Sequence, residues 1–199
     1  MGVDAESASR VETLAQSLKR AASALEAESV PYLLGGGLGC WARGGPPSSN
    51  DIDQMIEREQ AERALATLAA AGMRTEKPPE QWLFKAWDGE ILIDLIFEPA
   101  GVRITKEVLE RGEELSVAGM YVRVMALDDI LVTKLLALDE HCADYRDLLQ
   151  VGRALREQID WASLRERTAA SPFSRAFFEL ADGLQISSPL PASPEAADP

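Results

Sequence analysis

Leu34-Gly35-Gly36-Gly37 and Asn50-Asp51-Ile52-Asp53 are the two stretches of this 199-residue chain that decide its fold. If Asp51 to Asp53 lie on a strand, the two carboxylates point to one face and Ile52 points into the core. Carboxylates held this close repel each other, and a divalent cation such as Mg²⁺ removes that repulsion. Glycines lack a Cβ and let backbone N–H groups approach phosphate oxygens closely. The two stretches together predict a site for a metal-bound nucleoside triphosphate.

A third carboxylate, Asp94, lies within the otherwise apolar run Ile91–Phe97, which is typical of a buried strand. The preceding run, residues 81–87, is joined to it through Asp88-Gly89, a strong signal for a type I′ hairpin. A two-residue loop at Asp88-Gly89 predicts that Leu83 faces Asp94 and that Lys85 is its diagonal neighbour. An Asp inside such a strand is costly unless it is paired or metal-bound. Asp94 is therefore predicted to be a metal ligand or an ion-pair partner of Lys85.

This arrangement resembles the nucleotidyltransferase superfamily of DNA polymerase β, and within it the minimal bacterial nucleotidyltransferases and the AbiEii-type toxins. The resemblance implies an α+β fold in which a small mixed β-sheet core with helices is followed by a helical C-terminal part. It also implies transfer of a nucleoside monophosphate from an NTP such as ATP to an acceptor hydroxyl, with release of pyrophosphate.

The resemblance assigns roles to the residues already quoted. Gly36 and Gly37 would touch the triphosphate. Asp51 and Asp53 would hold two Mg²⁺ ions, with Mn²⁺ as an alternative, and Asp94 would complete the metal site and help to activate the acceptor. The family often has Ser where this chain has Gly37, and usually a hydrophobic residue where it has Gln54.

The same resemblance reaches the C-terminal half. Val124–Leu135 is similar to a strand and helix of the family that carry a lysine, here Lys134. An Asp on the next helix of the family matches Asp144 first, and Asp147 is a competing match. Each has a simpler interpretation, because a lysine beside an apolar helix face often extends to solvent and an Asp often caps a helix. Arg43 could contact phosphate or be an ordinary surface arginine.

The acceptor is predicted from charge and from the resemblance. The toxin members favour RNA, first a tRNA 3′ end, and imply an antitoxin partner. The net charge of −13 instead favours a small hydroxylated cation such as an aminoglycoside antibiotic. A basic strip in the C-terminal part could hold RNA phosphates or be ordinary helix surface; with Lys134 it comprises Arg146, Arg153, Arg156, Arg165, Arg167 and Arg175. A third hypothesis is an inactive nucleotide-binding module.

Other sites and locations are less favoured by the sequence. Gly37–Ala42 fits the Gly-x-Gly-x-x-Ala turn of dinucleotide-binding proteins, but Gly44-Gly45-Pro46-Pro47 ends the following helix too soon. One histidine and two distant cysteines make a zinc site improbable. No apolar run approaches a membrane span, and the acidic N-terminus lacks a signal region, so a cytoplasmic location is expected.

Helical and strand patterns predict the organisation of the chain. Helices are expected over residues 9–27 and 57–71, from Leu127 onward, from Asp160, and from Ser171-Pro172 to Gly183; strands are expected at 32–34 and 120–125. We predict a nucleotidyltransferase core over residues 1–124, a helical C-terminal part over 125–186 and a disordered tail over 187–199, which is rich in Pro, Ala and Ser.

Overall fold

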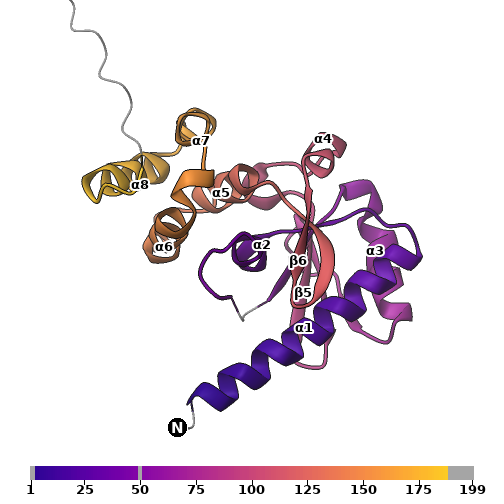
Figure 1. The fold of residues 1–199 in the computed structure, drawn as a ribbon. Coiled ribbons are helices and arrows are strands. Elements are labelled where there is room, and N and C mark those ends of the chain that lie inside the picture. Colours follow the sequence, from indigo (N-terminus) through magenta and orange to yellow (C-terminus); the bar gives the residue numbers. More distant parts are fainter. Residues whose placement is uncertain (1–2, 49–50, 188–199) are drawn as a thin grey trace, which may run out of the picture.

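The computed structural model describes residues 3–48 and 51–187 and has the predicted mixed α+β architecture (Figure 1). The strands are β1 (Leu33–Leu34), β2 (Ile52–Met55), β3 (Arg74–Glu76), β4 (Leu83–Asp88), β5 (Ile91–Ile96), β6 (Glu113–Val117) and β7 (Met120–Val124). The α-helices are α1 (Val3–Ala27), α2 (Gly36–Ala42), α3 (Ala61–Ala70), α4 (Lys106–Glu110), α5 (Leu127–Leu136), α6 (Arg146–Leu155), α7 (Trp161–Thr168) and α8 (Pro172–Gly183). Short 3₁₀ turns lie at η1 (Arg58–Gln60), η2 (Pro99–Gly101) and η3 (Arg156–Gln158).

The seven strands form one sheet in the order β3-β4-β5-β2-β1-β7-β6. The β2–β5 and β1–β7 pairs are parallel, and the other neighbouring pairs are antiparallel. The sheet is therefore mixed, and its central strands β5, β2 and β1 are drawn from three separate stretches of the chain. This topology brings residues 51–55 beside residues 91–96.

Side-chain alternation divides the sheet into two faces with separate apolar clusters. Ile52 and Ile93 belong to the cluster that also contains the buried side chains of α1 and α3. Met55, Leu83 and Ile96 belong to the other cluster, which contains the buried residues of α5 to α8. Figure 1 shows the sheet nearly edge-on, with α1 and α3 on one side and α2 and α5–α8 on the other. Residues two positions from Met55 and Ile96, namely Asp53 and Asp94, thus lie on the face of the C-terminal helices.

The β4–β5 hairpin forms as predicted, but its register differs from the prediction. Asp88 pairs with Ile91, so the two loop residues are Gly89 and Glu90 rather than Asp88 and Gly89. Gly89 has φ +61° at the first central position, as in a type II′ turn. Each pair therefore shifts by two residues, and Lys85 lies directly opposite Asp94 instead of diagonal to it.

Local capping signals identify the last two helices correctly. The Asp160 side chain accepts the Ser163 N–H at the start of α7, and Ser171 caps α8 ahead of Pro172. The prediction missed three short elements, β3, β6 and α4, whose sequences carry weak periodicity. Helix α1 begins at Val3, earlier than the predicted residue 9.

Two predicted boundaries can be compared with the structure, the division at residue 124 and the start of the tail at residue 187. Leu33 of the predicted core and Phe177 of the predicted helical part share one apolar cluster, so the division at residue 124 stays a prediction. Ser187 is buried against Asp182, to which its hydroxyl donates, and the rest of the predicted tail lies outside the described residues. None of the described helices is both long and apolar enough to cross a membrane.

Candidate active site

Three carboxylates meet where β2 and β5 run side by side. The parallel register places Asp53 opposite Asp94, and Asp51 immediately precedes β2. One carboxylate oxygen from each of the three residues lies within 4.8 Å of the others. The sequence placed all three on strands, whereas β2 begins one residue later, at Ile52. The predicted cluster of Asp51, Asp53 and Asp94 nevertheless forms.

The pKa values of the cluster show that ionising its carboxylates is unfavourable without a nearby cation. Burial, and then the Asp51 and Asp94 carboxylates, raise the pKa of Asp53 to about 7. Burial also raises the pKa of Asp94 to about 6; Lys85 opposes this shift and Asp51 adds to it. The Asp94 Oδ1 atom is buried without a hydrogen-bond partner among the described residues. A carboxylate oxygen left bare beside two others fits a divalent cation, which prefers such ligands.

The glycine turn is built against the second carboxylate. The Gly35 N–H donates to the Asp53 carbonyl at 2.8 Å and ties the turn to β2. Gly36 has φ +54°, and a Cβ there would lie 1.6 Å from the Asp53 Oδ2 atom. Only glycine fits this position without moving the carboxylate. The predicted phosphate contact of Gly36 stays a prediction, and the structure adds a second reason for glycine here.

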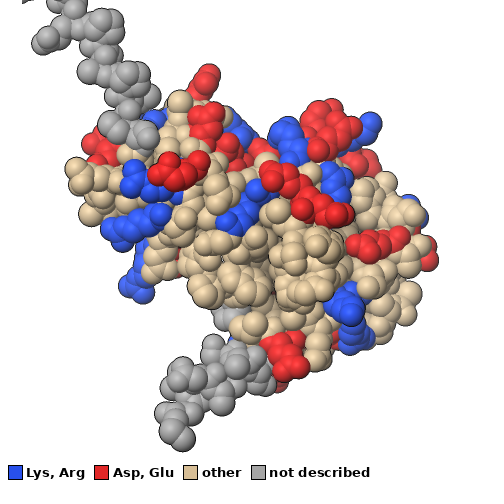
Figure 2. Space-filling model, viewed as in Figure 1, with Lys and Arg blue, Asp and Glu red and all other residues tan. Residues whose placement is uncertain are grey.

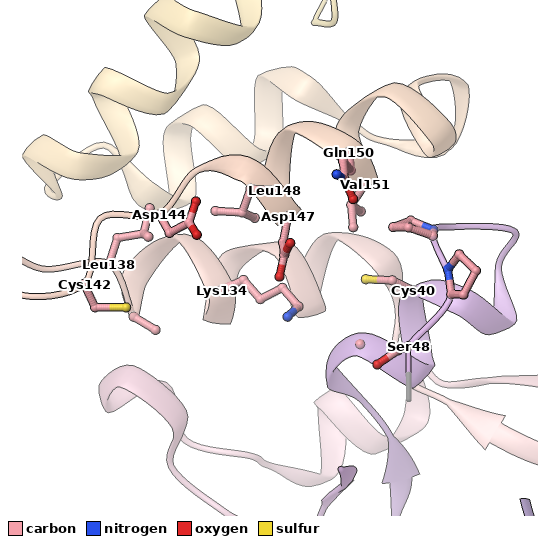
Figure 3. Close-up of a pocket in the computed structure, with 14 residues that line it drawn as sticks. Cys40, Ser48, Lys134, Leu138, Cys142, Asp144, Asp147, Leu148, Gln150 and Val151 are labelled. Atoms are coloured by element: carbon pink, nitrogen blue, oxygen red, sulfur yellow. The ribbon is translucent and has the colours of Figure 1, made fainter. Parts of the chain in front are cut away.

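Beside the carboxylates lies a cavity of about 440 Å³ between α2, α5 and α6 (Figure 3). Gly37, Ser48 and Lys134 line it on the side nearest the carboxylates, and Asp144 and Asp147 line it from α6 and the preceding loop. The carboxylates themselves are not part of its wall. Ser48 is a residue that the sequence analysis missed; a Cβ on Gly37 would lie 2.4 Å from its hydroxyl. The sequence separation of eleven residues gives no sign of this contact.

Lys134 lies on α5 and is half-buried. Burial raises the pKa of Asp53 and of the Cys40 thiol, and the charge of Lys134 opposes both shifts, which places its ammonium group near both. It forms no ion pair within the described ranges 3–48 and 51–187. An unpaired cation beside three carboxylates and an open cavity is free to meet a phosphate. Its functional role stays a prediction.

Asp144 and Asp147 occupy different places in the cavity wall. The Asp144 Oδ1 atom accepts the Arg146 N–H at 2.9 Å and so contacts the first residue of α6, although Tyr145 occupies the N-cap position. Asp147 lies in the first turn of α6, and Figure 3 shows its carboxylate pointing into the space toward Lys134. Asp144 is the first match from the resemblance, but the geometry favours Asp147 as the carboxylate that faces Lys134.

Arg43 departs from the phosphate contact suggested by the sequence. Its guanidinium donates to the Met125 carbonyl at 2.9 Å and to Glu113 at 3.3 Å, and its side chain is 7% exposed. These contacts link α2 to β6 and the end of β7. Because the guanidinium is held inside the fold, we leave Arg43 out of the proposed phosphate site.

Lys85 is the second residue that sequence reasoning misplaced. It lies directly opposite Asp94 on β4, is half-buried, and lowers the pKa of Asp94. The Asp88-Gly89 pair indicated the hairpin, but whether Lys85 faces Asp94 depended on which two residues form the turn.

Comparisons with known proteins show which solved structures share this fold. The crystal structure of ANT(2″)-Ia in complex with adenylyl-2″-tobramycin matches with a TM-score of 0.62 at 18% identity, over 83% of this chain and 99% of that one. The solution structure of ANT(2″)-Ia also has a TM-score of 0.62 at 18% identity, over 87% and 98% of the two chains. A putative nucleotidyltransferase from H. pylori has a TM-score of 0.54 at 16% identity, over 94% and 84%. No match was found among curated protein sequences.

The fold and the family match together identify the protein as an enzyme, a nucleotidyltransferase. The chain belongs to the family described as "Uncharacterised nucleotidyltransferase", whose pattern matches residues 4–184.

Proposed function

We propose that the protein transfers a nucleoside monophosphate from a metal-bound NTP to a hydroxyl group of a small, hydroxylated, positively charged molecule. The observation that carries the proposal is the convergence of Asp51, Asp53 and Asp94 beside a cavity that also exposes Lys134. A 440 Å³ space is of the size that commonly holds a small ligand or cofactor. The reaction class follows from the carboxylates, and the acceptor class follows from the net charge of the protein.

The three carboxylates fit the divalent cations that this reaction requires. Asp94 has a bare buried oxygen, and burial together with the neighbouring carboxylates raises the pKa values of Asp53 and Asp94. Asp51, Asp53 and Asp94 would hold Mg²⁺, as one or two ions, and Mn²⁺ offers the same chemistry. Such a cation, when bound, neutralises the phosphate oxygens and the charge that develops during transfer.

The chain itself supplies binding, orientation and a proton acceptor. We place the β- and γ-phosphates along Gly37, Ser48 and Lys134, where the Lys134 ammonium offsets their charge. The acceptor oxygen attacks the α-phosphorus, the bond from this phosphorus to the bridging oxygen breaks, and pyrophosphate leaves. Asp94, whose carboxylate lies beside those of Asp51 and Asp53, takes the proton of the attacking hydroxyl.

Charge supports a cationic acceptor. The net charge is −13, and four of the six arginines of the C-terminal helices already have a partner among the described residues. Arg167 pairs with Asp129, Arg165 with Asp182, and Arg156 with Glu157. Arg175 donates to the Ala169 carbonyl. On the face shown in Figure 2, basic side chains are interspersed with acidic ones rather than forming a continuous strip.

The similar fold of ANT(2″)-Ia, whose crystal structure contains adenylyl-2″-tobramycin, is compatible with such an acceptor. The tRNA acceptor and the antitoxin partner expected from the sequence remain predictions without support from the fold. The inactive-module hypothesis also remains, because NTP binding and transfer are separate properties. Use of a cellular NTP agrees with the cytoplasmic location predicted from the sequence.

One experiment tests the reaction and the acceptor together. The protein is incubated with Mg²⁺, each α-labelled NTP in turn, and either tobramycin and related aminoglycosides or total tRNA. The Asp51→Ala/Asp53→Ala variant is the control. We expect label on the small molecule only with the intact protein. Label on tRNA alone would overturn the proposed acceptor, and NTP binding without any labelled product would favour the inactive module.

A further inference from the structure

The sheet register arranges two rows of side chains beside the carboxylates, on the same face. The first row runs from β3 to β2 through Glu76, Lys85, Asp94 and Asp53. The second row consists of Arg74, Trp87 and Leu92, which are paired across β3, β4 and β5. Neighbouring strands lie about 4.8 Å apart, so Lys85 and Leu92 adjoin the carboxylates and Trp87 is about 10 Å from β2.

This part of the face is not covered by the C-terminal helices. The apolar cluster of α5–α8 takes in Leu83 and Ile96, but neither Trp87 nor Leu92 belongs to it. Lys85, Trp87 and Leu92 are all half-buried. The Arg74 guanidinium lies 3.5 Å from the centre of the Trp87 ring and holds the indole in place. The result is a supported aromatic wall that stands open beside Asp94.

The geometry of in-line displacement determines which substrate lies against Lys85, Trp87 and Leu92. The attacking oxygen and the leaving pyrophosphate lie on opposite sides of the α-phosphorus. With the β- and γ-phosphates placed at Gly37, Ser48 and Lys134, the leaving group lies on the side of α2 and α5. The attacking hydroxyl must then approach from β5 and β4, where Lys85, Trp87 and Leu92 lie.

We propose that Lys85, Trp87 and Leu92 form the acceptor subsite, and that it takes a hydroxylated saturated ring bearing an ammonium group. This inference rests on the proposed function. The acceptor ring lies against the part of the Trp87 indole that the Arg74 guanidinium leaves uncovered, and its ammonium group makes a cation–π contact there. The Lys85 ammonium repels the charged end of the acceptor, so that a neutral hydroxyl is presented to Asp94. Trp87 and Lys85 therefore set both the choice and the orientation of the acceptor.

The kinetic test compares Trp87→Ala with Trp82→Ala. Trp82 is 41% exposed and lines a separate cavity with Glu98 and Arg103, so it controls for loss of an exposed indole. We expect Trp87→Ala to raise KM for the acceptor at least tenfold and to leave KM for the NTP within twofold. Trp82→Ala should change neither. An unchanged acceptor KM in Trp87→Ala would overturn the inference.

A binding test needs no turnover and separates this inference from the proposed function. Tobramycin is titrated into the Mg²⁺-loaded protein without NTP while tryptophan fluorescence is recorded. We expect a saturable change in the intact protein and in Trp82→Phe, and its loss in Trp87→Phe, which keeps an aromatic side chain and the packing. No fluorescence change in the intact protein would overturn this acceptor class, whatever the labelling experiment showed. A change that persists in Trp87→Phe would place the ligand elsewhere.

Discussion

At the scale of single residues, Gly36 connects the glycine turn to the metal site. A methyl group there would meet the Asp53 carboxylate, and its φ of +54° disfavours any side chain. We expect Gly36→Ala to displace Asp53, to weaken Mg²⁺ binding at least tenfold and to lower kcat/KM by about 100-fold or more. Isothermal titration with Mg²⁺ and steady-state kinetics measure the two effects.

Gly72→Ala is the matched control for Gly36→Ala. Gly72 also has a positive φ, +86°, but nothing lies within 4 Å of the added methyl group. It should lose about 1 kcal/mol of stability, as expected for alanine in this conformation, and keep its Mg²⁺ affinity. Equal loss of Mg²⁺ binding in both variants would show that backbone strain, not the contact with Asp53, causes the defect.

The raised carboxyl pKa values predict how stability depends on pH. The pKa is about 7 for Asp53 and about 6 for Asp94 in the folded protein, against roughly 3.9 for an unfolded chain. Folding therefore favours the protonated forms. Their contribution is complete below about pH 4 and is lost as the pH rises through 6 and 7.

In EDTA, we therefore expect Tm to fall between about pH 4 and pH 7, and Asp53→Asn to reduce that fall. At pH 8 the variant should melt several degrees higher, since 1 kcal/mol corresponds to about 2–4 °C for a chain of this size. Mg²⁺ should raise the Tm of the unmodified protein most at pH 8, where the carboxylates are ionised. Parallel Tm profiles for the two proteins in EDTA would contradict the assignment.

At the scale of elements, the β4–β5 hairpin shows what the sequence could and could not predict. Alternation and the Asp-Gly pair identified both strands, because these signals are local. The register depended on whether Gly89 is the first or second loop residue, and either choice satisfies the hairpin preferences. The structure selects the first, and this moves Lys85 opposite Asp94. A slip of two residues keeps every side chain on its face, so the burial pattern could not have decided between the two registers.

Helix α5 carries the cation predicted to hold the leaving phosphates. We expect Lys134→Met to raise KM for the NTP about tenfold or more, as for loss of a charge-assisted contact, and Lys134→Arg to restore part of it. KM should be measured for both substrates, with the acceptor KM little changed. If KM for the NTP stays the same in Lys134→Met, the lysine merely extends to solvent, as the alternative interpretation of the sequence held.

Asp144 and Asp147, near the start of α6, are predicted to have different roles. Asp144→Ala should lower stability by about 1 kcal/mol through loss of its hydrogen bond to the Arg146 N–H, with little effect on KM for the NTP. Asp147→Asn should instead alter the kinetics with little effect on Tm. Thermal melts and kinetics on both variants decide the assignment, and a reversed pattern would make Asp144 the partner of Lys134.

A buried ion cluster joins α5 to α7 and to the segment after α4. The Asp129 side chain is 3% exposed and pairs with Arg111 at 2.8 Å and with Arg167. We expect Asp129→Ala to lower the free energy of unfolding by about 1–3 kcal/mol, because a buried carboxylate loses its charge-assisted hydrogen bonds while the partly exposed Arg111 and Arg167 stay hydrated. Glu157→Ala, which breaks an exposed pair with Arg156, should leave Tm nearly unchanged. Similar melting temperatures for the two variants would contradict a structural role for the cluster.

At the scale of the whole molecule, ion pairs between distant elements determine which charged side chains are available to a ligand. The six C-terminal arginines looked like a strip for RNA because only their spacing along the helices was visible. In the fold, Arg165 and Arg167 pair with acids 17 and 38 positions away. Strand identity, caps and the carboxylate motif are local and could be predicted, whereas these pairings, the Ser48 contact and the Trp87 wall depend on tertiary contacts.

Two exposed arginines of α6, Arg146 and Arg153, are in no ion pair with the rest of the described chain and allow a test of the acceptor class. An RNA acceptor needs such side chains for its phosphates, and replacing them should cost at least tenfold in acceptor binding. A cationic acceptor is repelled by them. We therefore expect Arg146→Glu/Arg153→Glu to keep or raise kcat/KM for a cationic acceptor at 50 mM salt, and the difference from the unmodified protein to shrink at 500 mM, where charges are screened over about 4 Å. A tenfold loss that grows at low salt would instead make α6 part of an anion-binding surface and return RNA to the first place among acceptors.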